Sequence, residues 1–333
     1  MKRLTVTGMF LLSIAVFSGP LSLAWAAADF SKVDGILGAK GQMQEGAWVV
    51  RFPRNDLKVR INGEDIPTAE GFGGWVAFKD MGKKTMVMGD LALLEEEVNP
   101  VISALQGGGL QITALHNHFL HEQPRIMFMH LEGAGNKESL ATGIRQALSQ
   151  TGLTKSGAHA PATIPGVAPP PSPGATSASA PAAAPEAKPQ TSPALESAPA
   201  AASRANLDTK RLEEIIGHPG QLTGEVFKIT VGRKGFKMQG MELTSSQGLN
   251  SWVAFVGAKD RAHAAGDILM TAKEVNRVIK TLRAGGIEVV AVHNHMLTEA
   301  PRAFFLHYWG TGPAEKLAQT VRAAFDEVKA PAK

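Results

Sequence analysis

One stretch of this chain occurs twice, and the duplication limits the architecture more than any other feature. Residues 116–135 and 293–312 share the pattern H-N-H-x-L-x-E-x-P-R-x-x-F-x-H-x-x-G-x-G, with every spacing kept. The match continues upstream, where Trp75-Val76-Ala77-Phe78 returns as Trp252-Val253-Ala254-Phe255. Similarity at a fixed offset over this length indicates two copies of one domain.

The segment between the copies has a different composition. Residues 156–203 consist mainly of Ala, Pro, Ser and Thr, with almost no large apolar side chain. Such a segment buries too little apolar surface to offset the entropy of ordering it, and its prolines favour extended conformations. We therefore predict a Pro/Ala-rich linker over residues 153–205, between domains at 29–152 and 206–330.

Residues 1–28 have the layout of a secretory signal peptide: Lys2 and Arg3, an apolar stretch over residues 9–17, and an A-x-A-like exit at residues 24–26. The apolar stretch is short for a membrane span of roughly 20 residues, so an uncleaved anchor is the weaker alternative. This pattern predicts an exported, periplasmic protein with no stable membrane insertion after signal cleavage.

Composition excludes several classes of site. The chain has no cysteine, which rules out disulfides, thiolate metal sites, a cysteine nucleophile and a lipidated cysteine. The formal net charge is +4, and no lysine or arginine cluster provides the concentrated positive face that nucleic acid requires. We expect no nucleic-acid partner.

Periodicity predicts an α+β fold in each copy, with a mostly antiparallel sheet and two helices. In the first copy apolar residues at three- and four-residue steps predict a helix over 91–106, and Leu140, Ile144 and Leu148 mark a second. The expected strands are residues 47–52, 57–61, 74–78, 85–88, 110–120 and 124–131.

The repeated histidines have the spacing of metal ligands. His116 and His118 are one strand step apart, so their side chains project from the same face. His130, on the returning strand, shares that face only if paired residue numbers sum to an even value. Three histidines with an open or carboxylate fourth position are typical of zinc and other divalent metals. The second copy repeats the set as His293, His295 and His307.

Charged residues near the turn supply further candidates. Glu122 and Glu299 are predicted as a fourth ligand or as a general base acting on metal-bound water, and hence as catalytic residues. Arg125 and Arg302 are predicted either to hold an anionic substrate or to pair with the nearby glutamate. Two aspartates, Asp90 and Asp267, are interpreted as outer partners of the ligands or as helix-start residues.

The duplication also serves as an internal control. His121 becomes Thr298, and His159, His218 and His263 have no counterpart, so these four are interpreted as surface or incidental. Met127 and Met129 would suggest copper, but the second copy has Phe304 and Leu306 there, which favours core packing. Buried, hydrogen-bonded histidines without a metal are the structural alternative.

At these residues the sequence resembles the mycobacterial LppY/LpqO lipoprotein family, a domain family of unknown function. The matching features are the H-N-H…E-x-P-R…H…G-x-G stretch and the preceding E-V-N of residues 97–99 and 274–276. The resemblance covers about residues 30–150 and 206–328, and it implies an exported or cell-envelope protein without an established activity. The absence of a lipidation cysteine disfavours membrane attachment.

Two functions remain open from the sequence. The first is an exported protein with a divalent-metal site, zinc first, in each repeat, and with lyase or hydrolase chemistry on a small polar substrate. The second is a non-catalytic periplasmic ligand-binding or scaffold protein. The sequence does not decide whether the protein is an enzyme. Either function suits an intramolecular pseudo-dimer of the two repeats or two tethered binding modules.

Overall fold

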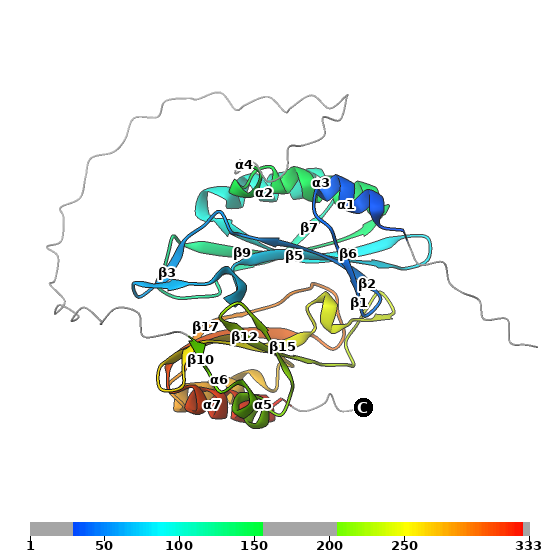
Figure 1. The fold of residues 1–333 in the computed structure, drawn as a ribbon. Coiled ribbons are helices and arrows are strands. Elements are labelled where there is room, and N and C mark those ends of the chain that lie inside the picture. Colours follow the sequence, from blue (N-terminus) through cyan, green and yellow to red (C-terminus); the bar gives the residue numbers. More distant parts are fainter. Residues whose placement is uncertain (1–28, 156–204, 329–333) are drawn as a thin grey trace, which may run out of the picture.

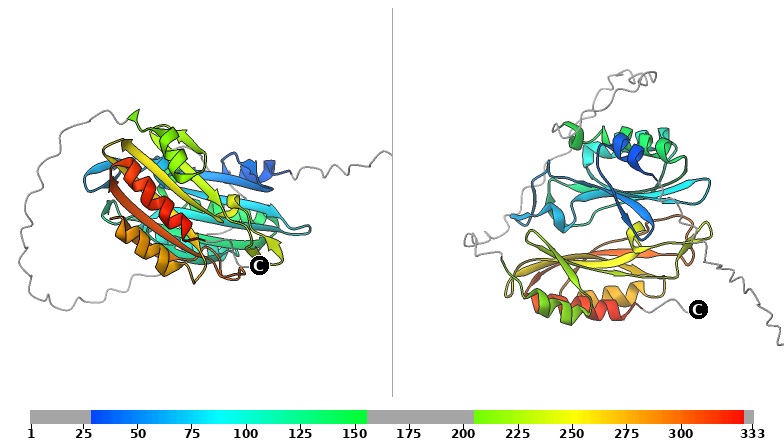
Figure 2. Two further views of the ribbon diagram at one scale, coloured as in Figure 1. Left: turned by 90° about the horizontal axis from the view of Figure 1, so that it is seen from below. Right: turned by 45° about the vertical axis from the view of Figure 1, so that its right-hand side comes forward.

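The two repeats stack with their sheets facing each other and their helices on the two outer faces (Figure 1). A view from another side keeps this order of layers (Figure 2). The computed structural model describes residues 29–155 and 205–328, so the predicted signal peptide and nearly all of the predicted linker lie outside the described residues. None of the helices in these two ranges is long and apolar enough to cross a membrane.

The first repeat combines a six-stranded sheet with a layer of helices. Its strands are β1 (Gln42–Gln44), β2 (Ala47–Pro53), β3 (Val59–Ile61), β4 (Glu64–Ile66), β5 (Gly73–Asp80), β6 (Thr85–Leu94), β7 (Gln111–His116), β8 (Glu122–Gln123) and β9 (Ile126–Gly135). Its helices are α1 (Ser31–Leu37), α2 (Glu95–Gly107), α3 (Lys137–Leu148) and α4 (Gly152–Lys155), with one 3₁₀ turn, η1 (Thr68–Glu70).

The second repeat has the same plan. Its strands are β10 (Ala205–Asn206), β11 (Gly220–Thr223), β12 (Val226–Gly232), β13 (Lys237–Met238), β14 (Met241–Glu242), β15 (Asn250–Ala258), β16 (Ala262–Met270), β17 (Glu288–His293) and β18 (Phe304–Gly312). Its helices are α5 (Thr209–Ile216), α6 (Val275–Ala284) and α7 (Ala314–Asp326), with the 3₁₀ turn η2 (Ser245–Gln247).

The main sheets have matching strand orders, β1-β2-β5-β6-β9-β7 and β11-β12-β15-β16-β18-β17. Neighbouring strands along both orders are antiparallel, and only the short β10 pairs parallel, with β15. The predicted α+β class with mostly antiparallel sheets is confirmed. Each repeat also has an N-terminal helix, α1 or α5, that periodicity did not predict because it is only two turns long.

The boundary between β6 and α2 differs from the prediction. Residues 91–94 were expected to begin a helix, but they complete β6, and α2 begins at Glu95. Nine of the ten residues of β6 are buried, because one face of the strand packs on helices and the other faces the second repeat. A strand buried on both faces is apolar throughout, so its pattern cannot be distinguished from that of a buried helix.

Two apolar clusters join the repeats. In one, Trp309 of β18 packs among first-repeat residues, with its ring centroid 5.5 Å from that of Phe119. In the other, Met86 and Met88 of β6 pack among residues of the second repeat. Each sheet is therefore covered on both faces, and polar side chains on the inner faces become buried between the repeats.

Candidate functional site

The six repeated histidines all lie between the two sheets. His116 ends β7, His118 follows it in the connecting segment, and His130 lies in β9. Their counterparts occupy the same places at the end of β17, just beyond it, and in β18. All six are buried, with at most 9% of each residue exposed. The fold therefore gathers into one place the residues that the duplication singled out.

The predicted strand register is confirmed. Ala114 pairs with His130 and His116 with Phe128, so the paired numbers have an even sum at the site. Ala291 and His307 pair in the same way in the second repeat. In the first repeat a shift between Ile112 and Ala114 changes the pairing from an odd to an even sum, which turns His130 to the face that His116 occupies. The expected strand over 110–120 ends at His116, so His118 reaches the cluster from a loop.

The shortest contacts among the histidine rings run between the repeats. Ring centroids are 3.7 Å apart for His116 and His293, 3.8 Å for His118 and His307, and 3.9 Å for His130 and His295. Within the first repeat, His116 lies 5.2 Å from His118 and 5.1 Å from His130. The six rings thus form a single cluster, and each contact between the repeats has an equivalent when the two copies are exchanged.

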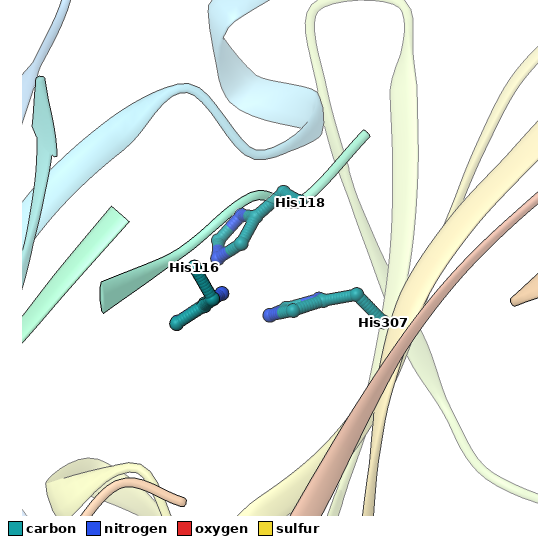
Figure 3. A group of neighbouring side chains, drawn as sticks. All are labelled: His116, His118 and His307. Carbon is teal, nitrogen blue, oxygen red and sulfur yellow. The ribbon is translucent and has the colours of Figure 1, made fainter. Parts of the chain in front are cut away.

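Three groups of side chains in this cluster have ligand atoms close enough to share a metal ion, all within 4.8 Å of one another. They are His116, His118 and His307; His116, His130 and His293; and Asp267, His293 and His295. Figure 3 shows the first group, with His307 reaching from the opposite repeat toward the other two.

Two of these three groups combine histidines of both repeats, and the third, Asp267 with His293 and His295, lies within the second repeat. A site built from the three histidines of one repeat stays a prediction. The pseudosymmetric counterpart of the trio in Figure 3 is His293, His295 and His130, in which His130 lies 3.9 Å from His295 and 5.6 Å from His293 by ring centroids. Each H-N-H pair thus faces the third histidine of the other repeat.

Two aspartates complete the cluster. Asp90 lies within β6, with its Oδ2 3.7 Å from Nε2 of His118 and 3.9 Å from Nε2 of His130. Asp267, its counterpart in β16, has Oδ2 3.5 Å from Nε2 of His295. Both lie in mid-strand, so the interpretation of these residues as helix starts is wrong, whereas partnership with the histidines fits their positions.

Burial controls the ionisation of this cluster. Burial, and next the charge of Asp267, raise the pKa of Asp90 to about 8, and burial also raises the pKa of Asp267. Burial lowers the pKa of His116, His295 and His307 to about 3, and it lowers those of the other three well below the usual value. The imidazoles are therefore neutral near pH 7, which is the form that binds metals.

Most polar atoms of the cluster have no hydrogen-bond partner in the described parts of the chain. They are Asp90 Oδ1, Asp267 Oδ1, His116 Nε2, both ring nitrogens of His118 and His293, His130 Nε2, His295 Nδ1 and His307 Nε2. His307 Nδ1 lies 3.1 Å from the carbonyl oxygen of Gly266, which only accepts, so Nδ1 carries the proton and Nε2 keeps a free lone pair. Buried polar groups are normally partnered, so this set of donor atoms fits a metal ion.

A cavity of about 930 Å³ lies between the sheets beside the cluster. On the first sheet a row of paired residues borders it, in the order Arg51, Trp75, Asp90 and His130. On the second sheet the corresponding row is Thr230, Trp252, Asp267 and His307. Residues paired directly across neighbouring strands share a face, so each row leads from the cavity to the histidines.

The structure does not bring Glu122, Arg125, Glu299 or Arg302 to the cluster. Glu122 Oε1 lies 3.5 Å from Nη1 of Arg125, and Glu299 Oε2 lies 3.3 Å from Nη1 of Arg302. Both glutamates also accept from a backbone N–H of their own turn, at Ile126 and Ala303, respectively. None of the four borders the cavity. Their catalytic and substrate-binding roles stay predictions, and the contacts support the alternative of a glutamate–arginine pair.

One interpretation from the single-copy histidines is wrong. His263 is buried, and its Nδ1 lies 2.9 Å from Oε1 of Glu70, which belongs to the other repeat. The first-repeat equivalent of His263 is Met86, and it lies against Gln247, the equivalent of Glu70. The same interface position thus holds a histidine–glutamate pair once and a weak hydrogen bond from a glutamine amide to a methionine sulfur once. Comparison of the copies alone could not find it. His121 and His218 are exposed as expected, and His159 lies outside the described residues.

Comparison with known proteins identifies the domain. The family model described as Domain of Unknown Function (DUF1259) matches residues 31–150 and again 210–327. The chain belongs to this family. Both DUF1259 copies contain the complete histidine motif, and the two matches establish the internal duplication. A search of functionally curated proteins gives no match.

Two solved structures show a remote likeness. One is the trimeric bacterial microcompartment shell protein PduB, with 10% identity, a TM-score of 0.20, and coverage of 87% of this chain and 91% of that one. The other is EtuB from Clostridium kluyveri, with 9% identity, a TM-score of 0.18, and coverage of 86% and 90%. Scores this low carry no argument about the DUF1259 copies.

Proposed function

We propose that this protein binds a divalent transition metal, zinc first, in the histidine cluster between its repeats. The observation that carries the proposal is the set of six buried, neutral imidazoles that converge across the interface, each with at least one ring nitrogen that lacks a hydrogen-bond partner in the described residues. His116, His118 and His307 would hold one ion, and His293, His295 and His130 another. Three histidine ligands leave a coordination position open, as catalytic zinc sites do.

The position of the cluster supports metal-assisted lyase or hydrolase chemistry on a small polar substrate. A bound divalent ion supplies Lewis acidity and lowers the pKa of coordinated water. The protein supplies the cavity and two buried carboxyl groups beside the histidines. Asp90 lies 3.7 Å from His118 and, unlike Glu122, forms no ion pair with an arginine of the described residues, so it suits general acid–base work better.

The cellular setting belongs to the same proposal. The N-terminal pattern supports export to the periplasm, and the motif supports a relationship to LppY/LpqO lipoproteins, without the lipid that a cysteine would carry. The two apolar clusters between the sheets support an intramolecular pseudo-dimer over two independent modules. A small-molecule ligand is the partner that the cavity suits.

Elemental analysis of the full chain tests metal binding. The protein would be purified without chelator or histidine tag, beside a variant with His116, His118, His293 and His295 changed to alanine. A matched control changes the exposed His121 and His218 to alanine. We expect about two equivalents of one transition metal in the parent and control, since two histidine trios are available, and almost none in the folded four-histidine variant. A parent that holds no metal and takes up no zinc, manganese, iron or copper would leave the ligand-binding or scaffold function.

A glycine that borders the cavity offers a subtler test. Gly248 has φ +86°, and a Cβ there would lie 3.1 Å from the Trp75 ring and 3.2 Å from Nδ1 of His295. Gly248→Ala should displace His295 and weaken metal binding by about tenfold, the range of losses seen when ligand positioning is disturbed. Gly240→Ala is the matched control, because Gly240 has φ +81° and open space around it.

Both alanines should lower the free energy of unfolding by about 1 kcal/mol through backbone strain. Metal affinity, measured by competition with a chromogenic chelator, should fall only in Gly248→Ala. Equal affinities in the two variants would show that His295 does not need its observed position.

A further inference from the structure

The cavity beside the histidine cluster contains two cationic side chains that face it from opposite repeats. Arg51 projects from β2 at the outer end of the first row, and Lys228 projects from β12 of the second repeat. The charge of Arg51 is close enough to act on Lys228, where it is the second cause, after burial, that lowers the pKa of the lysine to about 8. Two cations held near each other raise the electrostatic energy of the protein unless an anion lies between them.

Neither cation forms a direct ion pair with a carboxylate of the described residues, although Asp267 acts on Lys228 at longer range. Lys228 places Nζ 3.7 Å from the centre of the Trp252 ring, a cation–π contact that fixes the ammonium at the cavity wall. Arg51 donates from Nη2 to the side-chain oxygen of Gln44 over 3.3 Å, and that partner is neutral. Both side chains are therefore positioned by neutral partners, and neither is held in a direct ion pair.

The carboxyl groups that border the cavity make no direct ion pair with Arg51 or Lys228 in the described residues, and Asp267 alone among them acts on the charge of Lys228. Glu45 accepts from the backbone N–H of Ser246 on the other repeat, at 3.0 Å. Asp90 and Asp267 lie within the histidine cluster, with Oδ2 of each 3.7 Å and 3.5 Å, respectively, from Nε2 of His118 and His295.

The two cations break the symmetry of the cavity. The register places Thr230 where the first repeat has Arg51, and Val49 where the second repeat has Lys228. Arg51 and Lys228 therefore bring positive charge to one side of the cavity, whereas the equivalent residues, Thr230 and Val49, bring a hydroxyl and an apolar side chain to the other.

We infer that Arg51 and Lys228 form an oxyanion subsite that holds a carboxylate or phosphate group of the substrate beside the histidine cluster. The inference deepens the proposed function, and it rests on that function for the metal-dependent chemistry. The substrate class is then a small polar oxyanion whose charged group lies on the cations while its remaining part extends along the row toward Asp267 and the histidines.

Isothermal titration calorimetry of the full chain tests the subsite with two probes, acetate and inorganic phosphate. Each probe would be titrated into zinc-loaded and chelator-treated protein, because the chelator-treated sample reports the cations alone. The variants are Arg51→Gln and Lys228→Gln. The control is Arg211→Gln, which removes an exposed charge from α5 on the outer helix layer. Metal content would be measured on every sample.

We expect saturable binding of at least one probe, weakened about tenfold or more by each cavity variant and unchanged in the control, as the loss of a charged hydrogen bond implies. The preferred probe identifies the carboxylate or the phosphate as the recognised group. The variants should keep the metal content of the parent. Anion binding that persists unchanged in both cavity variants, or that is absent from parent protein, overturns the subsite. A parent that is purified without metal and takes up no added zinc, but still binds the probe through Arg51 and Lys228, overturns the metal proposal alone.

Discussion

The double variant His118→Ala/His307→Ala should keep about one of two metal equivalents, whereas His118→Ala/His130→Ala should lose nearly all bound metal. The first pair belongs to one trio that spans the repeats, and the proposed second trio of His293, His295 and His130 remains complete. The second pair belongs to one repeat but to both trios. Loss of a ligand should reduce affinity more than the roughly 10–100-fold cost of losing an outer partner.

This comparison separates the two arrangements because they predict opposite results. If each repeat held its own ion, His118→Ala/His130→Ala would damage one site, and His118→Ala/His307→Ala would damage both. The measurement is elemental analysis after dialysis against a weak chelator, with circular dichroism to show that both variants are folded. Retention of more metal by the His118/His130 variant would reject the trios that span the repeats.

Metal-free protein should lose stability steeply as the pH falls from about 6.5 toward 4. The folded cluster keeps its histidines neutral, with pKa values near 3 for His116, His295 and His307. Unfolded histidines titrate near 6.5. Between these values the unfolded chain binds more protons, so the free energy of unfolding rises with pH and falls as acid is added. Each such histidine contributes a slope of about 1.4 kcal/mol per pH unit.

The aspartates act in the opposite direction. Asp90 has a folded pKa of about 8, well above its unfolded value, so between the two values the folded state binds the additional proton. Its contribution to stability is present at low pH and is lost as the pH rises toward 8. The pKa of Asp267 is raised as well, so it acts in the same sense. Six histidines outweigh two aspartates, and the net slope below pH 6.5 remains positive.

Urea unfolding of chelator-treated protein between pH 4.5 and 7.5 measures this slope. His116→Gln/His293→Gln should lower the slope by about 3 kcal/mol per pH unit, because two proton-excluding groups are removed. His121→Gln/His218→Gln is the control and should leave it unchanged. A flat profile in the parent over this range would show that the cluster is protonated in the folded state.

Sequence reasoning recovered the repeated unit and the even register that brings His130 to the face of His116. Both follow from local spacing, which a duplicated motif makes easy to detect. It could not tell which histidines share an ion, because equivalence between copies says nothing about which copy faces which. The position of Asp90 within a strand could not be predicted either, because it also depends on the second repeat. The apolar residues that follow it suit a helix or a doubly buried strand, and only the presence of the second sheet decides between them.

Selecting only residues that occur in both copies also missed residues of interest. Requiring a residue in both copies selected the six clustered histidines correctly, but it dismissed His263 and gave no reason to notice Arg51 or Lys228. These three lie where the copies differ. The sequence did contain a usable signal. A position that is charged in one copy and neutral in the other indicates that the two copies differ in role there. Their common location between the repeats appears only in three dimensions.

Fusion of the two copies gives this interface a freedom that two identical subunits would lack. In a symmetric homodimer, any residue placed on one side of the cavity appears on the other, so an arginine at position 51 would occur twice. Here the second-repeat equivalent of Arg51 is Thr230. Likewise, Glu70 contacts His263, whereas its equivalent Gln247 contacts Met86. The two sides of the cavity therefore differ in charge, so the proposed substrate would bind in one preferred orientation rather than in two equivalent ones.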